Sequence, residues 1–209
     1  IVDGNGRLWE AFLNTNSSIH LTSTLDSPLI LEPIRTPFIG IAIALPKKGF
    51  EDFIRMSCEA GIDKIQPLFS DRSVVKSISD DRQIRWNSII RESVEQCERL
   101  WKPEISQILN FKEWLPLANN SRKIAISLAR STNKIAIYNF INELKVDFDE
   151  LWIAIGPEGG WSLHEQKLAE DHSLNSISLG DFIMRTSTAG VVAAYCLASW
   201  RNQNLNFSQ

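Results

Sequence analysis

Two glycine-bearing chain reversals hold the residues whose types and spacing are best suited to chemistry. The first, residues 156–160, reads GPEGG and follows the apolar run 151–155. The second begins at Gly180, after a short predicted strand at 176–179, and leads to Thr186. Glycine lets backbone N–H and C=O groups approach a ligand closely, and open α/β sheets bind ligands beyond the carboxyl ends of their strands. The two reversals therefore predict one ligand site to which both contribute.

Each reversal is followed by a predicted helix start. Ser162 and Glu165 stand three residues apart and match the pattern of a capping box. Thr186 is a good N-cap for the small-residue helix that runs to Trp200. Arg185 precedes it and follows the apolar segment 182–184, which is a confined place for a charge.

The same residues also have plainer interpretations. Gly156, Gly159 and Gly160 suit an ordinary turn, and Arg185 suits an exposed surface position. Glu158 suits a solvated loop or the N-terminus of a helix. Basic residues interspersed with Asp and Glu suit a solvated face, and they are Arg72, Lys76, Arg82, Arg85, Arg99 and Lys102. Because two such loops occur at the spacing that one site requires, ligand binding is favoured over isolated turns.

The composition limits the class of protein. The chain has 209 residues, 44% of them hydrophobic, so it can hold one large or two small domains with a substantial core. No apolar run approaches the roughly eighteen residues of a membrane span, and no segment resembles a signal peptide. Three widely separated cysteines predict no disulfide framework and favour a reducing, cytoplasmic setting. The formal net charge of −3 favours a local basic patch over a broad one if nucleic acid binds.

Signatures of other ligand sites do not occur in the sequence. No G-x-G-x-x-G follows the first predicted strand, and no G-x-x-x-x-G-K-[ST] occurs anywhere. His20, His164 and His172 lack ligand spacing with any cysteine or acidic pair, so no metal site is predicted. Ser162 is better explained as a helix cap than as a nucleophile.

Apolar runs and helical spacing alternate along most of the chain. The pattern predicts strands at 38–45, 65–69, 124–128, 151–155 and 176–179, and helices at Phe50–Ala60, 84–100 and 186–200. Gly61 is the expected C-cap of the first helix. This alternation predicts an α/β protein whose mostly parallel sheet is covered by helices on both faces.

The N-terminal part reads differently. Asp3-Gly4-Asn5-Gly6 predicts a hairpin turn, followed by a strand at 8–13 and a polar loop at 14–27. The proline-punctuated stretch 28–37 is the predicted domain boundary. No initiator Met stands at position 1, so a truncated or processed start is expected.

The two reversals also carry a family resemblance. GPEGG followed by WSLHE, then LGDFIMRTSTA, resembles the SPOUT superfamily of S-adenosylmethionine-dependent RNA methyltransferases, and within it the RsmE family. Upstream, EAGIDKI at 59–65, SDRSVV at 70–75, Arg85-Trp86 and EQCER at 95–99 are similar to further motifs of that family. The resemblance extends from about residue 38 to Trp200.

The resemblance implies a particular architecture. A SPOUT-type domain is expected at 35–209, with a C-terminal trefoil knot in which residues 180–185 pass through the loop at 156–160. A partial PUA-like β-barrel segment is expected at 1–34. Half a barrel leaves an open strand edge, so this segment is expected to be poorly ordered or paired elsewhere.

The resemblance further implies methyl transfer from S-adenosylmethionine to N3 of a uridine in 16S ribosomal RNA, in a homodimer formed through the helix 186–200. Arg185 is the expected catalytic cation. Arg72, Arg99 and Lys102 are the expected RNA-binding residues. The expected cofactor-binding residues are Leu128, Ile155, Gly156, Pro157, Glu158, Gly159, Gly160, Leu179, Gly180, Ile183, Met184 and Thr186. Arg201, which would lie beyond the last helix, is expected to be replaceable.

Three positions depart from the family pattern. Phe182 stands where the family has an arginine, Ser187 where it has a glutamate, and Met56 where it has a lysine. These changes keep two alternatives open. One is a SPOUT methyltransferase that acts on another RNA, and the other is a non-catalytic RNA-binding or ribosome-assembly protein that retains the cofactor site.

Overall fold

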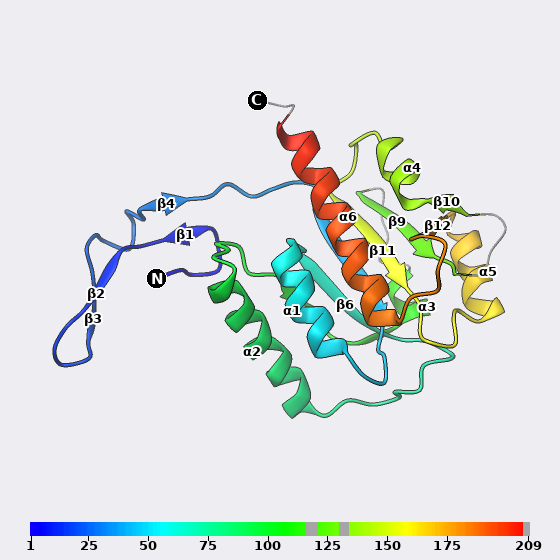
Figure 1. Ribbon diagram of the computed structural model, residues 1–209, viewed down its shortest axis with the longest axis horizontal. Helices are drawn as coiled ribbons and strands as arrows, with labels where there is room; N and C mark the ends of the chain where they lie inside the picture. The colour runs from blue at the N-terminus through cyan, green and yellow to red at the C-terminus, as the bar shows by residue number, and fades with distance from the viewer. Residues whose placement is uncertain (116–120, 130–133, 207–209) are drawn as a thin grey trace.

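The centre of the molecule is a parallel eight-stranded sheet (Figure 1). The computed structural model describes residues 1–115, 121–129 and 134–206. Seven strands lie in the order β10-β12-β9-β11-β5-β6-β7, β8 also pairs with β6, and every pairing in this sheet is parallel. The strands are β5 (Phe38–Ala44), β6 (Lys64–Phe69), β7 (Glu104–Ile105), β8 (Leu109–Asn110), β9 (Arg122–Ser127), β10 (Ile135–Ala136), β11 (Glu150–Ile155) and β12 (Asn175–Ser178).

The five predicted strands are all present, each displaced by no more than about two residues. Successive side chains of β11 enter opposite cores: Ile153 packs with the larger cluster, whereas Trp152 and Ala154 pack with the smaller one. A strand buried on both faces must be apolar throughout, which is why 151–155 reads as an unbroken apolar run. The two-residue strands β7, β8 and β10 were missed because such short segments carry no periodicity.

Helices cover both faces of the sheet, as predicted. The larger core is closed by α1 (Phe50–Ala60), α2 (Asp80–Gln96), α4 (Ile137–Asn142) and α6 (Thr186–Asn206). The smaller core is closed by α3 (Phe111–Trp114) and α5 (Leu163–Asp171). In Figure 1 the long α6 crosses in front of the sheet beside α1. The α/β layer arrangement expected from the sequence is therefore confirmed.

Helix ends agree with the prediction where a glycine sets them and differ elsewhere. Gly61 ends α1 in the left-handed conformation, with φ 101°, as expected. The second helix was predicted at 84–100 but lies at Asp80–Gln96. Asp80 and Asp81 favour the earlier start because carboxylates stabilise the first turn of a helix. Glu98, with φ 57°, turns the chain away before residue 100.

Arg201 was predicted to lie beyond the last helix, and that prediction is wrong. Helix α6 continues past Trp200, so Arg201 lies inside the molecule with only 3% of its surface exposed. Its guanidinium pairs with the carboxylate of Asp63 and donates to the carbonyls of Pro37 and Gly61, at 3.3 Å each. The same carboxylate accepts a hydrogen bond of 2.8 Å from the backbone N–H of Ile39 in β5. Asp63 thus ties α6 to the start of the sheet.

Arg99 joins the same cluster from the end of α2. Its guanidinium lies 3.6 Å from the carboxylate of Asp63. It also donates to the carbonyls of Cys58 and Ile62, each at 2.8 Å. The Arg99 side chain therefore satisfies carbonyls at the end of α1.

The N-terminal segment forms short antiparallel pairs that extend to one side of the sheet (Figure 1). Here β1 (Arg7–Leu8) pairs with β4 (Ile30–Leu31), and β2 (Ala11–Leu13) pairs with β3 (Ile19–Leu21). The predicted loop at 14–27 is therefore wrong in part, because β3 lies within it.

Backbone contacts connect this segment to residues 100–102. The N–H of Gly6 donates to the carbonyl of Leu100, and that of Lys102 to the carbonyl of Gly4, both at 2.9 Å. The Trp101 indole donates to the carbonyl of Glu32 at 3.1 Å. The N-terminal segment is thus paired with another part of the chain, one of the two outcomes expected for it. The division into two domains and the knot stay predictions.

None of the described helices is long and apolar enough to cross a membrane. All three cysteines are free, and burial raises the pKa of the Cys58 thiol to about 12. Cys58 is therefore protonated at neutral pH and is not a nucleophile.

Candidate functional site

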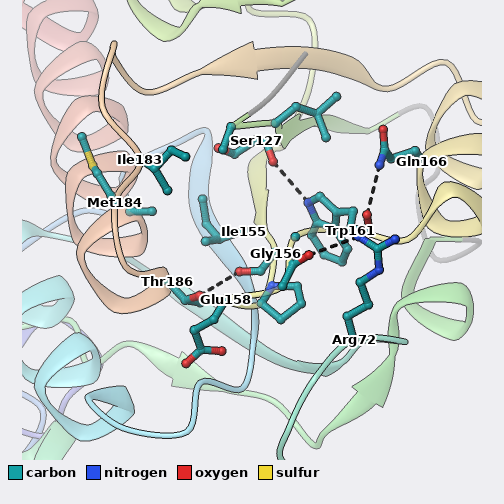
Figure 2. Close-up of a pocket in the computed structure, with 16 residues that line it drawn as sticks. Arg72, Ser127, Ile155, Gly156, Glu158, Trp161, Gln166, Ile183, Met184 and Thr186 are labelled. Carbon is teal, nitrogen blue, oxygen red and sulfur yellow. Dashed lines mark hydrogen bonds between the residues drawn. The ribbon is translucent and has the colours of Figure 1, made fainter.

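A cavity of about 470 Å³ opens at the carboxyl ends of β9 and β11 (Figure 2). Both chain reversals contribute to it, as the sequence predicted: the GPEGG loop after β11 forms one wall, and Ile183 and Met184 form another. Residues 127–129, at the end of β9, complete the wall beside the GPEGG loop. The cavity therefore lies where an open α/β sheet binds its ligands.

The GPEGG loop presents backbone to the cavity. The N–H of Gly160 donates to the carbonyl of Pro157 at 2.8 Å, which closes a tight turn. Gly160 has φ 69°, a conformation that glycine adopts without strain. A Cβ on Gly156 would lie 3.0 Å from the Trp161 indole nitrogen, tighter than most Cβ contacts. The glycines thus allow both the turn and the close packing of the loop on Trp161.

Trp161 anchors the far side of the loop. Trp161 is 3% exposed, and its ring packs in a tilted arrangement on that of Phe111, with 4.4 Å between the centroids. The indole Nε1–H donates to the carbonyl of Ser127 at 3.2 Å, and Gln166 Nε2 donates to the Trp161 carbonyl at 3.0 Å (Figure 2). This chain of contacts holds the ends of β9 and β11 at a fixed separation.

Thr186 joins the second reversal to the first, in a different way from that predicted. It was expected to be the N-cap of the last helix, but it is the first helical residue. Arg185 instead occupies the N-cap position, because its carbonyl accepts the first hydrogen bond of the helix, from the N–H of Ala189 at 2.9 Å. The Thr186 hydroxyl is thereby free to donate to the Gly156 carbonyl at 3.0 Å (Figure 2). Thr186 is 4% exposed, so this bond is shielded from water.

The predicted capping box at the start of α5 is confirmed. The Ser162 hydroxyl accepts from the Glu165 N–H at 3.1 Å, and Glu165 accepts from the Ser162 N–H at 2.8 Å. Glu165 is 2% exposed, and its other carboxylate oxygen accepts from the backbone N–H of Asp71 at 3.0 Å. This buried carboxylate therefore fixes the segment after β6 against α5.

Two charged residues lie at the cavity and bind backbone groups. Glu158 is exposed and accepts from the backbone N–H of Lys47, in the loop after β5, at 3.1 Å. Arg72 is also exposed and donates to the carbonyl of Gly159 at 3.2 Å (Figure 2). Arg72 thereby braces the GPEGG loop, and Glu158 connects this loop to the one after β5.

Most residues predicted to bind a cofactor line this cavity, namely Leu128, Ile155, Gly156, Pro157, Glu158, Gly159, Gly160, Ile183, Met184 and Thr186. Among the described residues, Leu179, Gly180 and Arg185 do not line it. Leu179 packs partly against the larger core, Gly180 is exposed with φ 148°, and Arg185 is exposed between two lining residues. Their roles stay predictions.

The three residues predicted to bind RNA lie in different surroundings. Arg72 lies at the cavity, whereas Lys102 is exposed beside the N-terminal segment. Arg99 is held by Asp63 and two carbonyls, so its guanidinium already has internal partners. This placement does not favour a phosphate contact by Arg99.

Sequence reasoning missed five residues of the cavity: Ser127, Ala129, Trp161, Gln166 and Ala189. For Trp161 a signal existed, since a tryptophan directly after a glycine loop needs a partner for its N–H. Gln166 and Ala189 contact the cavity because each lies within the first turns of a helix that begins there. In the described ranges, no group of three or more His, Cys, Asp or Glu could hold a metal ion.

Comparison with known proteins identifies the class. The model of the RNA methyltransferase domain family matches residues 35–198. The chain therefore belongs to this family, and its curated relatives place it with the RsmE group.

Those relatives are named ribosomal RNA small subunit methyltransferase E. The protein from Synechocystis sp. is 33% identical over 195 residues, which are 92% of this chain and 63% of that protein. The protein from Mesomycoplasma hyopneumoniae is 33% identical over 163 residues, covering 77% of this chain and 68% of that protein. The chain thus spans less than two thirds of the length of the Synechocystis relative.

A solved structure is similar in fold. A protein from Legionella pneumophila, in complex with the cofactor SAM, is 25% identical with a TM-score of 0.80. The match covers 95% of this chain and 81% of that one. It confirms the α/β methyltransferase fold that the resemblance implied.

Proposed function

We propose that the protein transfers a methyl group from S-adenosylmethionine to N3 of a uridine in 16S ribosomal RNA. The observation that carries this proposal is the cavity between the GPEGG loop and the start of α6, closed by the bond from Thr186 to Gly156. Membership of the RNA methyltransferase family supplies the reaction class. The names of the relatives supply the small-subunit RNA as substrate.

The residues of the cavity fit S-adenosylmethionine. Its volume of about 470 Å³ lies within the range of small-molecule sites. Leu128, Ile155 and Ile183 offer apolar contact for an adenine ring, and the backbone of the two loops offers hydrogen bonds. When bound, the cofactor supplies an electrophilic methyl group on a sulfonium.

The remaining catalytic requirement falls on the chain itself. The uridine imide must lose its N3 proton, and the anion that develops spreads onto the neighbouring oxygens. Arg185 lies between Met184 and Thr186, two residues that line the cavity, and its side chain is exposed. We assign it the stabilisation of this anion, since a cation is most effective where negative charge develops in the transition state.

Labelled methyl transfer tests the function. We expect S-adenosylmethionine to bind stoichiometrically by calorimetry, and the labelled methyl group to appear on small-subunit RNA at uridine N3. Methylation of a different RNA favours the first alternative, another SPOUT substrate. Cofactor binding without transfer to any RNA favours the non-catalytic alternative. No heat with millimolar cofactor contradicts the assignment of the cavity.

A homodimer through α6 is part of the proposal. Apart from the side that closes the core, this helix carries the half-buried Val191 and Val192 and the 65% exposed Tyr195. Apolar residues on the side of a helix that faces away from the core indicate a contact with another protein chain. We also propose a reducing, cytoplasmic location, which the three free cysteines support. The C-terminal trefoil knot and the PUA-like nature of residues 1–34 are likewise part of the proposal.

Light scattering tests the dimer. At micromolar concentration we expect twice the mass of one chain. Tyr195→Glu is expected to lower the mass towards that of a monomer, because it places a charge in the apolar contact. Tyr138→Glu, at a residue of α4 that is 69% exposed, is the matched control and should leave the mass unchanged. A monomeric wild type contradicts the proposal.

A further inference from the structure

A second cavity, of about 330 Å³, lies at the same edge of the sheet, beyond the carboxyl ends of β6 and β8. Its lining includes Ser70, Lys76, Asn110, Lys112 and His164. None of these residues contributes to the function assigned above. The cavity therefore needs an explanation of its own.

Three of the four oxygens of the two carboxylates that line this cavity, those of Asp71 and Glu165, already accept hydrogen bonds. Both carboxylate oxygens of Glu165 accept backbone N–H groups, and the carboxylate of Asp71 accepts the Ser162 hydroxyl. The Lys76 ammonium donates to two backbone carbonyls, those of Ser70 at 3.3 Å and Asp71 at 3.1 Å. Carbonyls orient an ammonium without neutralising its charge, and one of its three N–H donors remains.

Two further observations indicate an anionic ligand. The Ser70 hydroxyl is buried and has no hydrogen-bond partner within the described ranges, although Ser70 lines the cavity and is only 5% exposed. A buried polar group without a partner is uncommon in a folded protein. Lys112 adds a second ammonium, and His164 a ring nitrogen, both on exposed side chains. Two ammonium groups and a free hydroxyl suit a phosphate oxygen.

The two cavities share a wall. Asp71 lines the second and Arg72 the first, and likewise Glu165 lines the second and Gln166 the first. Neighbouring residues of two segments therefore face different cavities, and the bond from Asp71 N–H to Glu165 fastens the segments together. The two cavities are therefore neighbours at the same edge of the sheet.

We propose that the second cavity binds a backbone phosphate of the RNA, adjacent to the nucleotide presented to the cofactor. This inference rests on the proposed function. It adds a phosphate site formed by Lys76, Lys112 and Ser70, which determines the position of the strand rather than its sequence.

The test measures binding to the small-subunit RNA fragment that carries the methylated uridine, at several salt concentrations. For Lys76→Ala with Lys112→Ala we expect about tenfold weaker binding and a salt slope lower by roughly 0.7 for each lost contact. Calorimetric affinity for S-adenosylmethionine should not change. Lys145→Ala, at an exposed lysine after α4, is the matched control and should leave the salt slope unchanged.

Two further measurements separate a phosphate site from general charge. Ser70→Ala should weaken RNA binding without lowering thermal stability, because its hydroxyl has no partner to lose. An RNA with one neutral methylphosphonate beside the target uridine should bind the wild type more weakly but the double lysine variant equally. If the wild type binds the RNA and the lysine variants keep its salt slope, the phosphate site is wrong and the proposed function stands. If the wild type binds no RNA, both are wrong.

Discussion

Arg185→Ala is expected to retain cofactor binding and the fold while losing about a hundredfold in the rate of methyl transfer. Removing a charge-assisted contact made mainly in the transition state costs on the order of 3 kcal/mol. The fold should survive because the side chain is exposed, and the bond that begins α6 uses the backbone carbonyl of Arg185. Single-turnover rates with saturating cofactor measure the effect on the chemical step.

The control for this experiment is Arg91→Ala. Arg91 is exposed on α2 and does not line the cavity, so its replacement should leave the rate unchanged. Arg201, which the sequence alone suggested as a control, is unsuitable because it is buried. Full activity of Arg185→Ala would contradict the catalytic assignment. Loss of calorimetric cofactor binding would show that Arg185 acts on the cofactor instead.

Asp63→Ala is expected to destabilise the protein by about 3–5 kcal/mol, because it leaves the buried Arg201 and the half-buried Arg99 without their carboxylate. It also removes the acceptor for the Ile39 N–H. A loss of this size lowers the melting temperature by roughly 10 °C in a chain of this length. Thermal and urea unfolding measure it.

Glu59→Ala is the matched control for Asp63→Ala. Glu59 also pairs with an arginine, Arg55, at 3.0 Å, but both side chains of that pair are substantially exposed. Exposed ion pairs contribute about 0–1 kcal/mol, so the control should change stability little. Equal effects of the two substitutions would contradict the role assigned to the buried cluster.

The sequence predicted those features that depend on local chemistry. Gly61 ends α1 because its left-handed conformation favours glycine, and Ser162 with Glu165 starts α5 because the capping box is a contact between near neighbours. The five longer strands were visible because burial on both faces demands apolar residues. The cavity followed from two such local features lying at the ends of parallel strands.

What the sequence did not predict depends on contacts between distant segments. Arg99 and Arg201 look like surface residues until Asp63 is placed beside them. Thr186 looks like an N-cap because the Gly156 carbonyl that it binds lies thirty residues earlier. The second cavity is formed by residues from β6, the start of α3 and the start of α5, and no motif joins these three places.

The order of strands in the sheet has a consequence for how fast the chain folds. β5 lies between β6 and β11 in the sheet. Its register with β11 pairs Ile39 with Leu151, two residues that lie far apart in the sequence. Such distant pairing is slow, since the entropy of closing a long loop is lost before the contacts form. On the ribosome, β5 can pair with β6 early, but its pairing with β11 must wait until β11 has been synthesised, and the cavity must wait further for Thr186. A nascent chain therefore completes this cavity only once the start of α6 has emerged.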